Sequence, residues 1–190
     1  MDLTITKTPP ESLYEENLVL AFYTDERPPR GYSGLVDWRM NGLLSTEIAR
    51  GRISAAFGEK VIVPQPDRIA VKRLILFGLG PVSEATQGRL YEAGCRIVET
   101  MTDLLCRNFA VNVPTAGRPR LSIQETAEAM LWGYLETGSA EGKTLDKLRI
   151  CVQENHEAET AAAFERMKTL REKLLAATPA PAGGLAETHS

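Results

Sequence analysis

Apolar residues form short runs in some parts of the chain and recur at helical spacing in others. Short apolar runs that end at Gly or Pro are typical of buried strands, and a three- and four-residue spacing is typical of a helix with one buried face. The runs predict strands at residues 3–7, 17–23, 59–63, 70–77, 108–113 and 148–153. The spacing predicts long helices at 83–107, from 122 onward and at 157–176. Two short helical pieces are expected earlier in the chain, at 35–40 and 46–50.

Strands and helices therefore alternate along most of the chain, which is typical of a layered α/β sandwich. Two strands come first with no helix between them, so we expect a mixed rather than a purely parallel sheet. A chain of 190 residues with 43% hydrophobic content can bury one good core. We expect a single domain over residues 1–176 and a low-complexity, disordered tail over 177–190.

The most informative segment is the apolar run Leu74–Phe77, which breaks at Gly78, Gly80 and Pro81. The run predicts a central strand covered on both faces, and Ser83 is placed to cap the helix that follows. In open α/β folds such a strand-to-helix turn is where ligands bind, because backbone amides and the helix dipole point at it.

Two further loops are expected at the same edge of the sheet, residues 31–37 and 115–120. Backbone amides at helix starts, together with Arg118 and Arg120, would suit a phosphate group. The residues expected to bind such a ligand are Gly34, Asp37, Gly78, Gly80, Gly117 and Arg118. The alternative is that the glycines only make turns and the arginines are solvated. We favour this alternative, because a lone glycine-rich loop is weak evidence for a binding site.

Composition and motifs exclude several classes of protein. The net charge of −3 and the pI near 5.6 argue against a dedicated nucleic-acid binder. No apolar stretch approaches the length of a membrane span and the first seven residues alternate like a strand, so we expect a cytoplasmic protein. Only two histidines occur, and there is no His-Glu-x-x-His, Walker or Gly-x-Ser-x-Gly motif. We therefore predict no catalytic residue, no metal site and no cofactor.

At these residues the chain resembles macro domains, the ADP-ribose-binding α/β/α modules. Gly34-Leu35-Val36-Asp37 resembles the end of their glycine-rich phosphate loop, and Leu74–Pro81 resembles their strand ending in Val-Gly-Pro. Phe109–Pro114 followed by Gly117 resembles their second phosphate-loop strand. The paired-asparagine strand motif of macro domains is missing, and their triple glycine is replaced by Tyr32-Ser33-Gly34.

The closer resemblance, over residues 1–176, is to the amino-terminal, macro-like domain of leucyl aminopeptidases. Gly78-Leu79-Gly80 ends a strand as in that domain, and Ala129–Tyr134 occupies the place of its later Gly-x-x-x-Gly-x-Tyr-like segment. Nothing matches the metal-binding motif of the family's catalytic domain, so no catalytic residue is carried across.

Three functions stay open at this point. The first is a non-catalytic, stand-alone domain with an interaction, assembly or regulatory role, which would bind a protein partner or form a homo-oligomer. The second is a macro-type module that binds, or less readily hydrolyses, ADP-ribose or a related phosphate-bearing nucleotide. The third is DNA binding, which the acidic pI disfavours.

Overall fold

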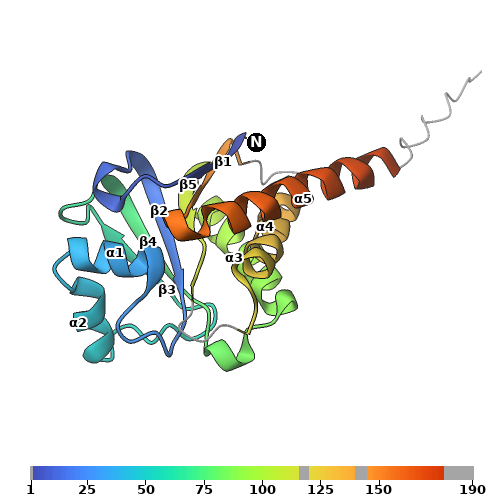
Figure 1. Ribbon diagram of the computed structural model, residues 1–190. Helices are drawn as coiled ribbons and strands as arrows, with labels where there is room; N and C mark the ends of the chain where they lie inside the picture. Colours follow the sequence, from blue (N-terminus) through green and yellow to red (C-terminus); the bar gives the residue numbers. More distant parts are fainter. Residues whose placement is uncertain (1, 116–119, 140–144, 178–190) are drawn as a thin grey trace, which may run out of the picture.

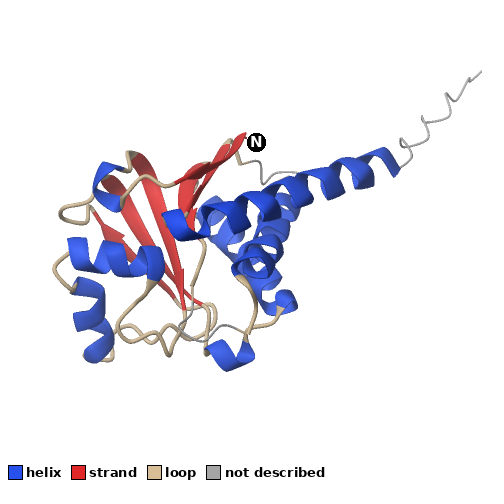
Figure 2. Ribbon diagram, viewed as in Figure 1, coloured by secondary structure: helices blue, strands red, loops and turns tan. Residues whose placement is uncertain are grey.

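A six-stranded mixed sheet separates two layers of helices (Figures 1 and 2). The structure is a computed structural model, and it describes residues 2–115, 120–139 and 145–177. The strand order is β1-β6-β5-β2-β4-β3, and all neighbouring strands pair in parallel except β4 and β3, which are antiparallel. The strands are β1 (Asp2–Thr6), β2 (Glu15–Phe22), β3 (Lys60–Pro64), β4 (Val71–Gly78), β5 (Asn108–Asn112) and β6 (Lys147–Cys151).

The helices cover the sheet unequally. The short helices α1 (Gly31–Arg39) and α2 (Leu43–Ala49) pack on one face. The longer helices α3 (Gln87–Asp103), α4 (Ile123–Gly138) and α5 (Glu157–Ala177) pack on the other. The described residues also form three 3-10 turns, η1 (Pro10–Ser12), η2 (Val82–Glu84) and η3 (Glu154–His156). The predicted three-layer α/β/α sandwich with a mixed sheet is confirmed.

The reason for the mixed sheet differs from the prediction. The first two strands are not neighbours, because β1 pairs in parallel with β6 at one edge and β2 lies at the centre between β5 and β4. The antiparallel strand is β3 instead, which lies at the opposite edge and pairs with β4. A short connection from β3 to β4 turns the chain back directly, whereas a parallel neighbour needs a longer crossover.

The starts of α3 and α4 show which sequence signals predict a helix cap correctly. Ser122 and Glu125 form the predicted capping box at the start of α4, with the Ser122 hydroxyl accepting from the Glu125 amide at 3.1 Å. Ser83 was predicted to cap the long helix that follows it, α3, but it does not. It lies in η2, and α3 begins at Gln87, where the Thr86 hydroxyl accepts from the Arg89 amide at 3.2 Å. Ser83 and Thr86 are both hydroxyl residues near the start of the predicted helix, and sequence spacing alone does not show which of them caps it.

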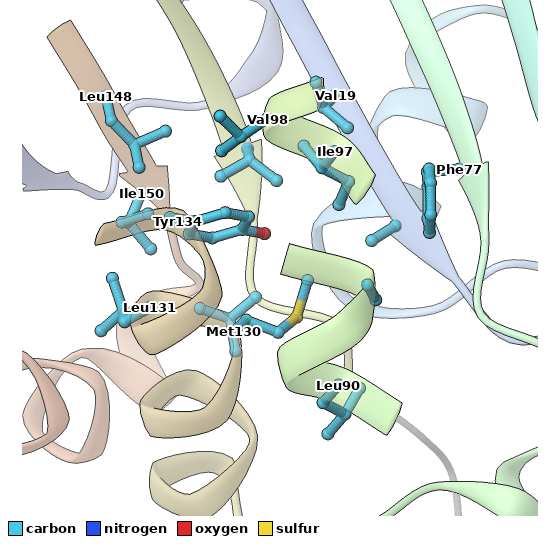
Figure 3. Close-up of a cluster of buried hydrophobic side chains, with 14 of the residues drawn as sticks. Val19, Phe77, Leu90, Ile97, Val98, Met130, Leu131, Tyr134, Leu148 and Ile150 are labelled. Atoms are coloured by element: carbon cyan, nitrogen blue, oxygen red, sulfur yellow. The ribbon is translucent and has the colours of Figure 1, made fainter. Parts of the chain in front are cut away.

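The central strands bury both faces, which explains their uninterrupted apolar runs. In β4, Ile75 and Phe77 point to the core under α3–α5, and Leu74 and Leu76 point to the core under α1 and α2. Figure 3 shows side chains of α3 and α4, among them Tyr134, facing the strand residues of the larger core. Each face thus excludes water from its own helix layer.

Helix α5 extends beyond the sheet it covers (Figure 1). Thr160, Ala163 and Met167 are buried in its first half, whereas Leu170 is 42% exposed. No helix within the described ranges has the length and apolarity that crossing a bilayer requires.

Candidate functional site

The carboxyl ends of β2, β4 and β5 lie at one edge of the sheet and bring three loops together. The Thr24 amide donates to the Gly80 carbonyl at 3.0 Å, which joins the segment after β2 to the turn after β4. The Val82 amide donates to the Asp25 carboxylate at 3.0 Å and strengthens the same junction. This edge is where ligands bind in open α/β sheets, so it is the candidate site.

The two glycines of the turn after β4 contact protein rather than open space. A Cβ added at Gly78 would lie 2.1 Å from the Ala56 carbonyl oxygen, so the 55–56 backbone fills that space. Gly80 has a φ of 73° and would place a Cβ 3.2 Å from the Arg89 guanidinium and 3.4 Å from Phe57 Cβ. Gly78 therefore needs glycine because backbone lies against it, and Gly80 because of its left-handed φ, whatever ligand this edge takes.

The glycines at the start of α1 are packed in the same way. Gly31 has a φ of 57°, and a Cβ there would lie 2.1 Å from Thr115 Oγ1. Gly34 follows within the helix, where a Cβ would lie 2.7 Å from the Pro29 carbonyl oxygen. Arg30 occupies the N-cap position and makes no side-chain capping hydrogen bond with the described part of the chain.

Asp37 is buried, and its carboxylate accepts hydrogen bonds from the neighbouring helix α2. The carboxylate accepts the Ser45 amide at 3.0 Å and also the Ser45 hydroxyl. Ser45 lies in the first turn of α2, whose N-cap residue Gly42 has no side chain to offer. The Asp37 side chain thus supplies from α1 the negative charge that the N-terminus of α2 favours.

Asn112 is a site residue that sequence reasoning missed. Its amide donates to the Ala21 carbonyl at 3.0 Å and to the Ser33 hydroxyl at 3.2 Å, and its carbonyl accepts the Ala21 amide at 2.7 Å. One side chain therefore fastens β5, β2 and α1 together at the candidate edge. The available signal was a single polar residue at the end of the apolar run 109–113.

Glu26 is the second missed residue and lies in the loop between β2 and α1. Its side chain is almost fully buried, with 4% of the residue exposed, and Oε1 has no hydrogen-bond partner. Burial raises the pKa of Glu26 to about 7, against a smaller lowering effect from the Tyr23 backbone and Arg30. The pKa of Tyr23 is raised too, by its burial first and then by the charges of Glu26 and Asp25. This edge of the sheet thus holds a carboxyl group that changes its charge near neutral pH.

The remaining predicted residues fall partly outside the structure's range. Gly117 and Arg118 lie outside the described residues. Arg120 is described, and its guanidinium donates to the Ser83 carbonyl, which ties it to η2. In the described ranges no group of three or more His, Cys, Asp and Glu side chains is arranged to hold a metal ion.

The order and packing of these elements can be compared with known proteins. The sequence profile of the cytosol aminopeptidase family, N-terminal domain, matches residues 19–138. The chain belongs to this family. The match spans the segment from β2 through α4, and so includes the candidate edge described above.

Among curated members of the cytosol aminopeptidase family, a probable cytosol aminopeptidase of Pseudomonas syringae pv. tomato is 23% identical over 159 residues. That alignment covers 79% of this chain and 32% of the relative, so the chain spans about a third of the length of the curated relative it matches. A tomato leucine aminopeptidase variant is similar in structure, with a TM-score of 0.57 and 18% identity, covering 90% of this chain and 37% of that one.

Macrodomains are similar in structure to most of this N-terminal domain. An Oceanobacillus iheyensis macrodomain with ADP gives a TM-score of 0.69 at 14% identity, covering 89% of this chain and 91% of that one. A Trypanosoma brucei macrodomain in complex with ADP-ribose gives 0.66 at 15% identity, covering 85% of this chain and 68% of that one. At these identities the likeness establishes a macro-like fold.

Proposed function

We propose that this N-terminal aminopeptidase-type domain is non-catalytic and acts as an interaction or assembly domain. One observation carries the proposal: the space beside the described glycines of the candidate site holds protein atoms. The Ala55–Ala56 backbone lies against Gly78, and the Pro29 carbonyl lies against Gly34. The buried Asp37 carboxylate is likewise engaged by Ser45. At Gly34, Gly78 and Asp37, atoms that hold the fold together thus take the place where a ligand would be contacted.

Its surface supports the same proposal. Large apolar side chains are exposed on both helix layers, notably Trp38 at 74% on α1 and Leu170 at 42% on α5. Exposed aromatic side chains are enriched where proteins bind one another. A domain that works by contact would need such residues, whereas catalysis would need reactive groups gathered at one place.

Peptidase activity is the direct test. The purified chain is incubated with leucine amide and either Mn²⁺ or Zn²⁺, and we expect no turnover above a mock purification from the same host. A chelator control identifies any contaminating metallopeptidase. Clear turnover that follows the chain through two different purification steps would contradict the proposal.

A second candidate is a macro-type module that binds ADP-ribose or a related nucleotide. It is favoured by the N-terminus of α1, where the N-cap residue Arg30 makes no side-chain hydrogen bond and Gly31 lies beside Thr115 of the loop after β5. Free helix amides are a ready anion site. Macrodomains with the same fold are described in complex with ADP and ADP-ribose.

The nucleotide candidate predicts a thermal shift. A ligand at about 100 times its Kd adds roughly 2.7 kcal/mol to the free energy of unfolding, so ADP-ribose would raise the Tm by several degrees. The Arg118→Ala variant would lose the shift, whereas Arg166→Ala, an exposed residue of α5, would keep it. An unchanged Tm at millimolar ADP-ribose and ADP would eliminate this candidate.

A further inference from the structure

Strand β1 forms one edge of the sheet and pairs on one side only, with β6 (Figure 1). The Asp2 amide donates to the Asp146 carbonyl at 2.7 Å, and the Thr6 carbonyl accepts the Val152 amide at 3.0 Å. In a parallel pair, alternate residues of a strand direct both backbone groups at the neighbouring strand. The even-numbered residues of β1 therefore face β6.

The odd-numbered residues of β1, Leu3 and Ile5, face the other way. Their backbone amides and carbonyls point away from β6, and no other backbone group of the described residues bonds to them. Their side chains pack on the core under α3–α5. The edge of β1 therefore offers unpaired amides and carbonyls to an added strand, whose alternate side chains would lie on the same face as this helix layer.

A pocket lies beside this edge, between β1, α4 and α5. Its volume is about 450 Å³, which is in the range of pockets that bind ligands. All three elements contribute to its apolar lining, which consists of Leu3, Leu131, Leu135, Phe164 and Met167. Leu3 thus belongs both to the unpaired edge, through its backbone, and to the pocket, through its side chain. An extended chain on the edge would hold one of its side chains beside an apolar lining.

The polar lining of the pocket favours an acidic partner. It consists of Lys168, Arg171 and Glu172 of α5, and no two of these lie within ion-pair distance. Lys168 is exposed and has no ion-pair partner among the described residues. Arg171 donates to the Ser139 hydroxyl at 2.8 Å, a neutral partner that orients the guanidinium and leaves its charge uncompensated. The pocket therefore has two cations against one carboxylate.

We propose that β1 binds an extended acidic segment of a partner protein, which adds to the sheet as a further edge strand. The backbone of Leu3 and Ile5 would pair with the segment. An apolar side chain of the segment would enter the pocket, and acidic side chains on either side of it would face Lys168 and Arg171. Main-chain pairing then supplies affinity, and the pocket and its cations select the sequence. This inference rests on the proposed interaction role and names the chemistry of the partner.

The probe is a synthetic peptide, Thr-Glu-Thr-Leu-Thr-Glu-Thr, labelled with fluorescein at one end. In an extended chain its leucine and both glutamates lie on one face, and the sequence reads the same in either direction, so it suits both strand directions. Fluorescence anisotropy with the full chain measures the Kd, which we expect to lie below about 1 mM. Replacing the leucine by alanine should weaken binding about tenfold or more, because the apolar contact in the pocket is lost.

Methylation of the peptide's backbone amides tests strand addition itself. Alternate residues of an added strand face β1 and the others face away. One peptide is methylated on its leucine and glutamate amides, and a second on its inner threonine amides. We expect one of the two to bind at least about tenfold more weakly and the other to keep its affinity. Loss in the first indicates an antiparallel strand, and loss in the second a parallel one.

Two charge reversals on α5 test the role of the cations. Lys168→Glu should weaken binding about fivefold or more, because it turns an attraction into a repulsion. Lys173→Glu is the matched control on an exposed lysine of the same helix that does not line the pocket, and it should change the Kd less than about twofold near 0.15 M salt. A peptide with lysines in place of its glutamates should bind Lys168→Glu better than the wild type.

Three outcomes overturn the inference: no binding of the peptide at about 1 mM, an equal response to both methylated peptides, or equal effects of Lys168→Glu and Lys173→Glu. The peptidase assay with leucine amide is independent of all three. A chain that shows neither peptide binding nor turnover refutes strand addition alone. Turnover refutes the proposed function, whatever the peptide does.

Discussion

Gly94 of α3 and Gly133 of α4 face one another where the two helices pack together. A Cβ added at Gly94 would lie 3.2 Å from the Gly133 Cα and 2.6 Å from the Met130 carbonyl oxygen. A Cβ added at Gly133 would lie 2.3 Å from the Tyr91 carbonyl oxygen and 2.9 Å from the Cys95 amide nitrogen. The helix backbones approach so closely because neither residue has a side chain.

Gly133→Ala is expected to lower the free energy of unfolding by about 2 kcal/mol, because the added methyl group forces α3 and α4 apart. In an isolated helix the same change is favourable by about 1 kcal/mol. A loss of stability in the protein would therefore come from the packing of α3 against α4. Urea unfolding monitored by circular dichroism measures the difference.

Gly88→Ala is the control for this comparison. Gly88 also lies in α3, but a Cβ there would meet no atom within 4 Å. We expect this variant to be as stable as the wild type or slightly more stable. Equal changes in the free energy of unfolding at positions 88 and 133 would show that close helix packing does not require glycine at position 133.

The sequence predicted layers and strands more completely than contacts. The run Leu74–Phe77 indicated a strand buried on both faces, since local apolarity determines that property directly. The position of β1 beside β6 depends on residues far apart along the chain, and local patterns carry no such information. The same limit applies to the candidate site. Gly78 was recognised as a special position, but the 55–56 backbone that fills its space comes from a loop with no distinctive pattern.

Asn112→Ala should destabilise the fold by about 2–4 kcal/mol. The change removes three hydrogen bonds and leaves the Ala21 amide and carbonyl buried without partners. Asn108→Ala is the control on the same strand, because Asn108 is exposed and should shift stability by less than about 0.5 kcal/mol. Chemical denaturation of both variants gives the two values. A tolerated Asn112→Ala would mean that water or a shift of β5 satisfies the Ala21 backbone.

Glu15 and Glu16 offer a test of buried against exposed charge at the amino-terminal edge of β2. The Glu15 side chain is 8% exposed and pairs with Lys147 at 3.2 Å and Arg149 at 2.8 Å. Glu15→Gln should cost about 2–4 kcal/mol, because it leaves both cations without their counter-charge. Glu16 pairs with Lys72 in solvent, so Glu16→Gln should have a much smaller effect.

Salt separates these two variants further. Added NaCl screens exposed pairs more than buried ones, so it should reduce the small Glu16 effect and leave most of the Glu15 effect in place. Unfolding free energies at about 0.05 and 1 M NaCl provide the measurement. Glu15 and Glu16 effects that fall equally with salt would show that the Glu15 network is open to solvent.

The buried Glu26 makes stability depend on pH in a defined direction. Its carboxyl has a pKa of about 7 in the folded chain, whereas an ordinary glutamate has 4.5. Between these values the folded state binds more protons than the unfolded state, so the contribution of Glu26 to stability is fully present below pH 4.5 and is lost as pH rises through 7. Above pH 7 the full difference of about 3 kcal/mol is missing.

Glu26→Gln keeps the shape of the protonated carboxyl but cannot ionise. The variant should match the wild type near pH 5 and exceed its stability by up to about 3 kcal/mol near pH 8, with most of the change between pH 5 and 7. The pKa of Glu16 is lowered, first by its hydrogen bond to Lys72, so Glu16→Gln should show the opposite trend and lose stability relative to the wild type as pH rises through 4.5. Denaturant titrations at half-unit pH steps compare the three proteins. A constant difference between wild type and Glu26→Gln from pH 5 to 8 would mean that Glu26 titrates normally, and that its carboxylate is hydrated in solution.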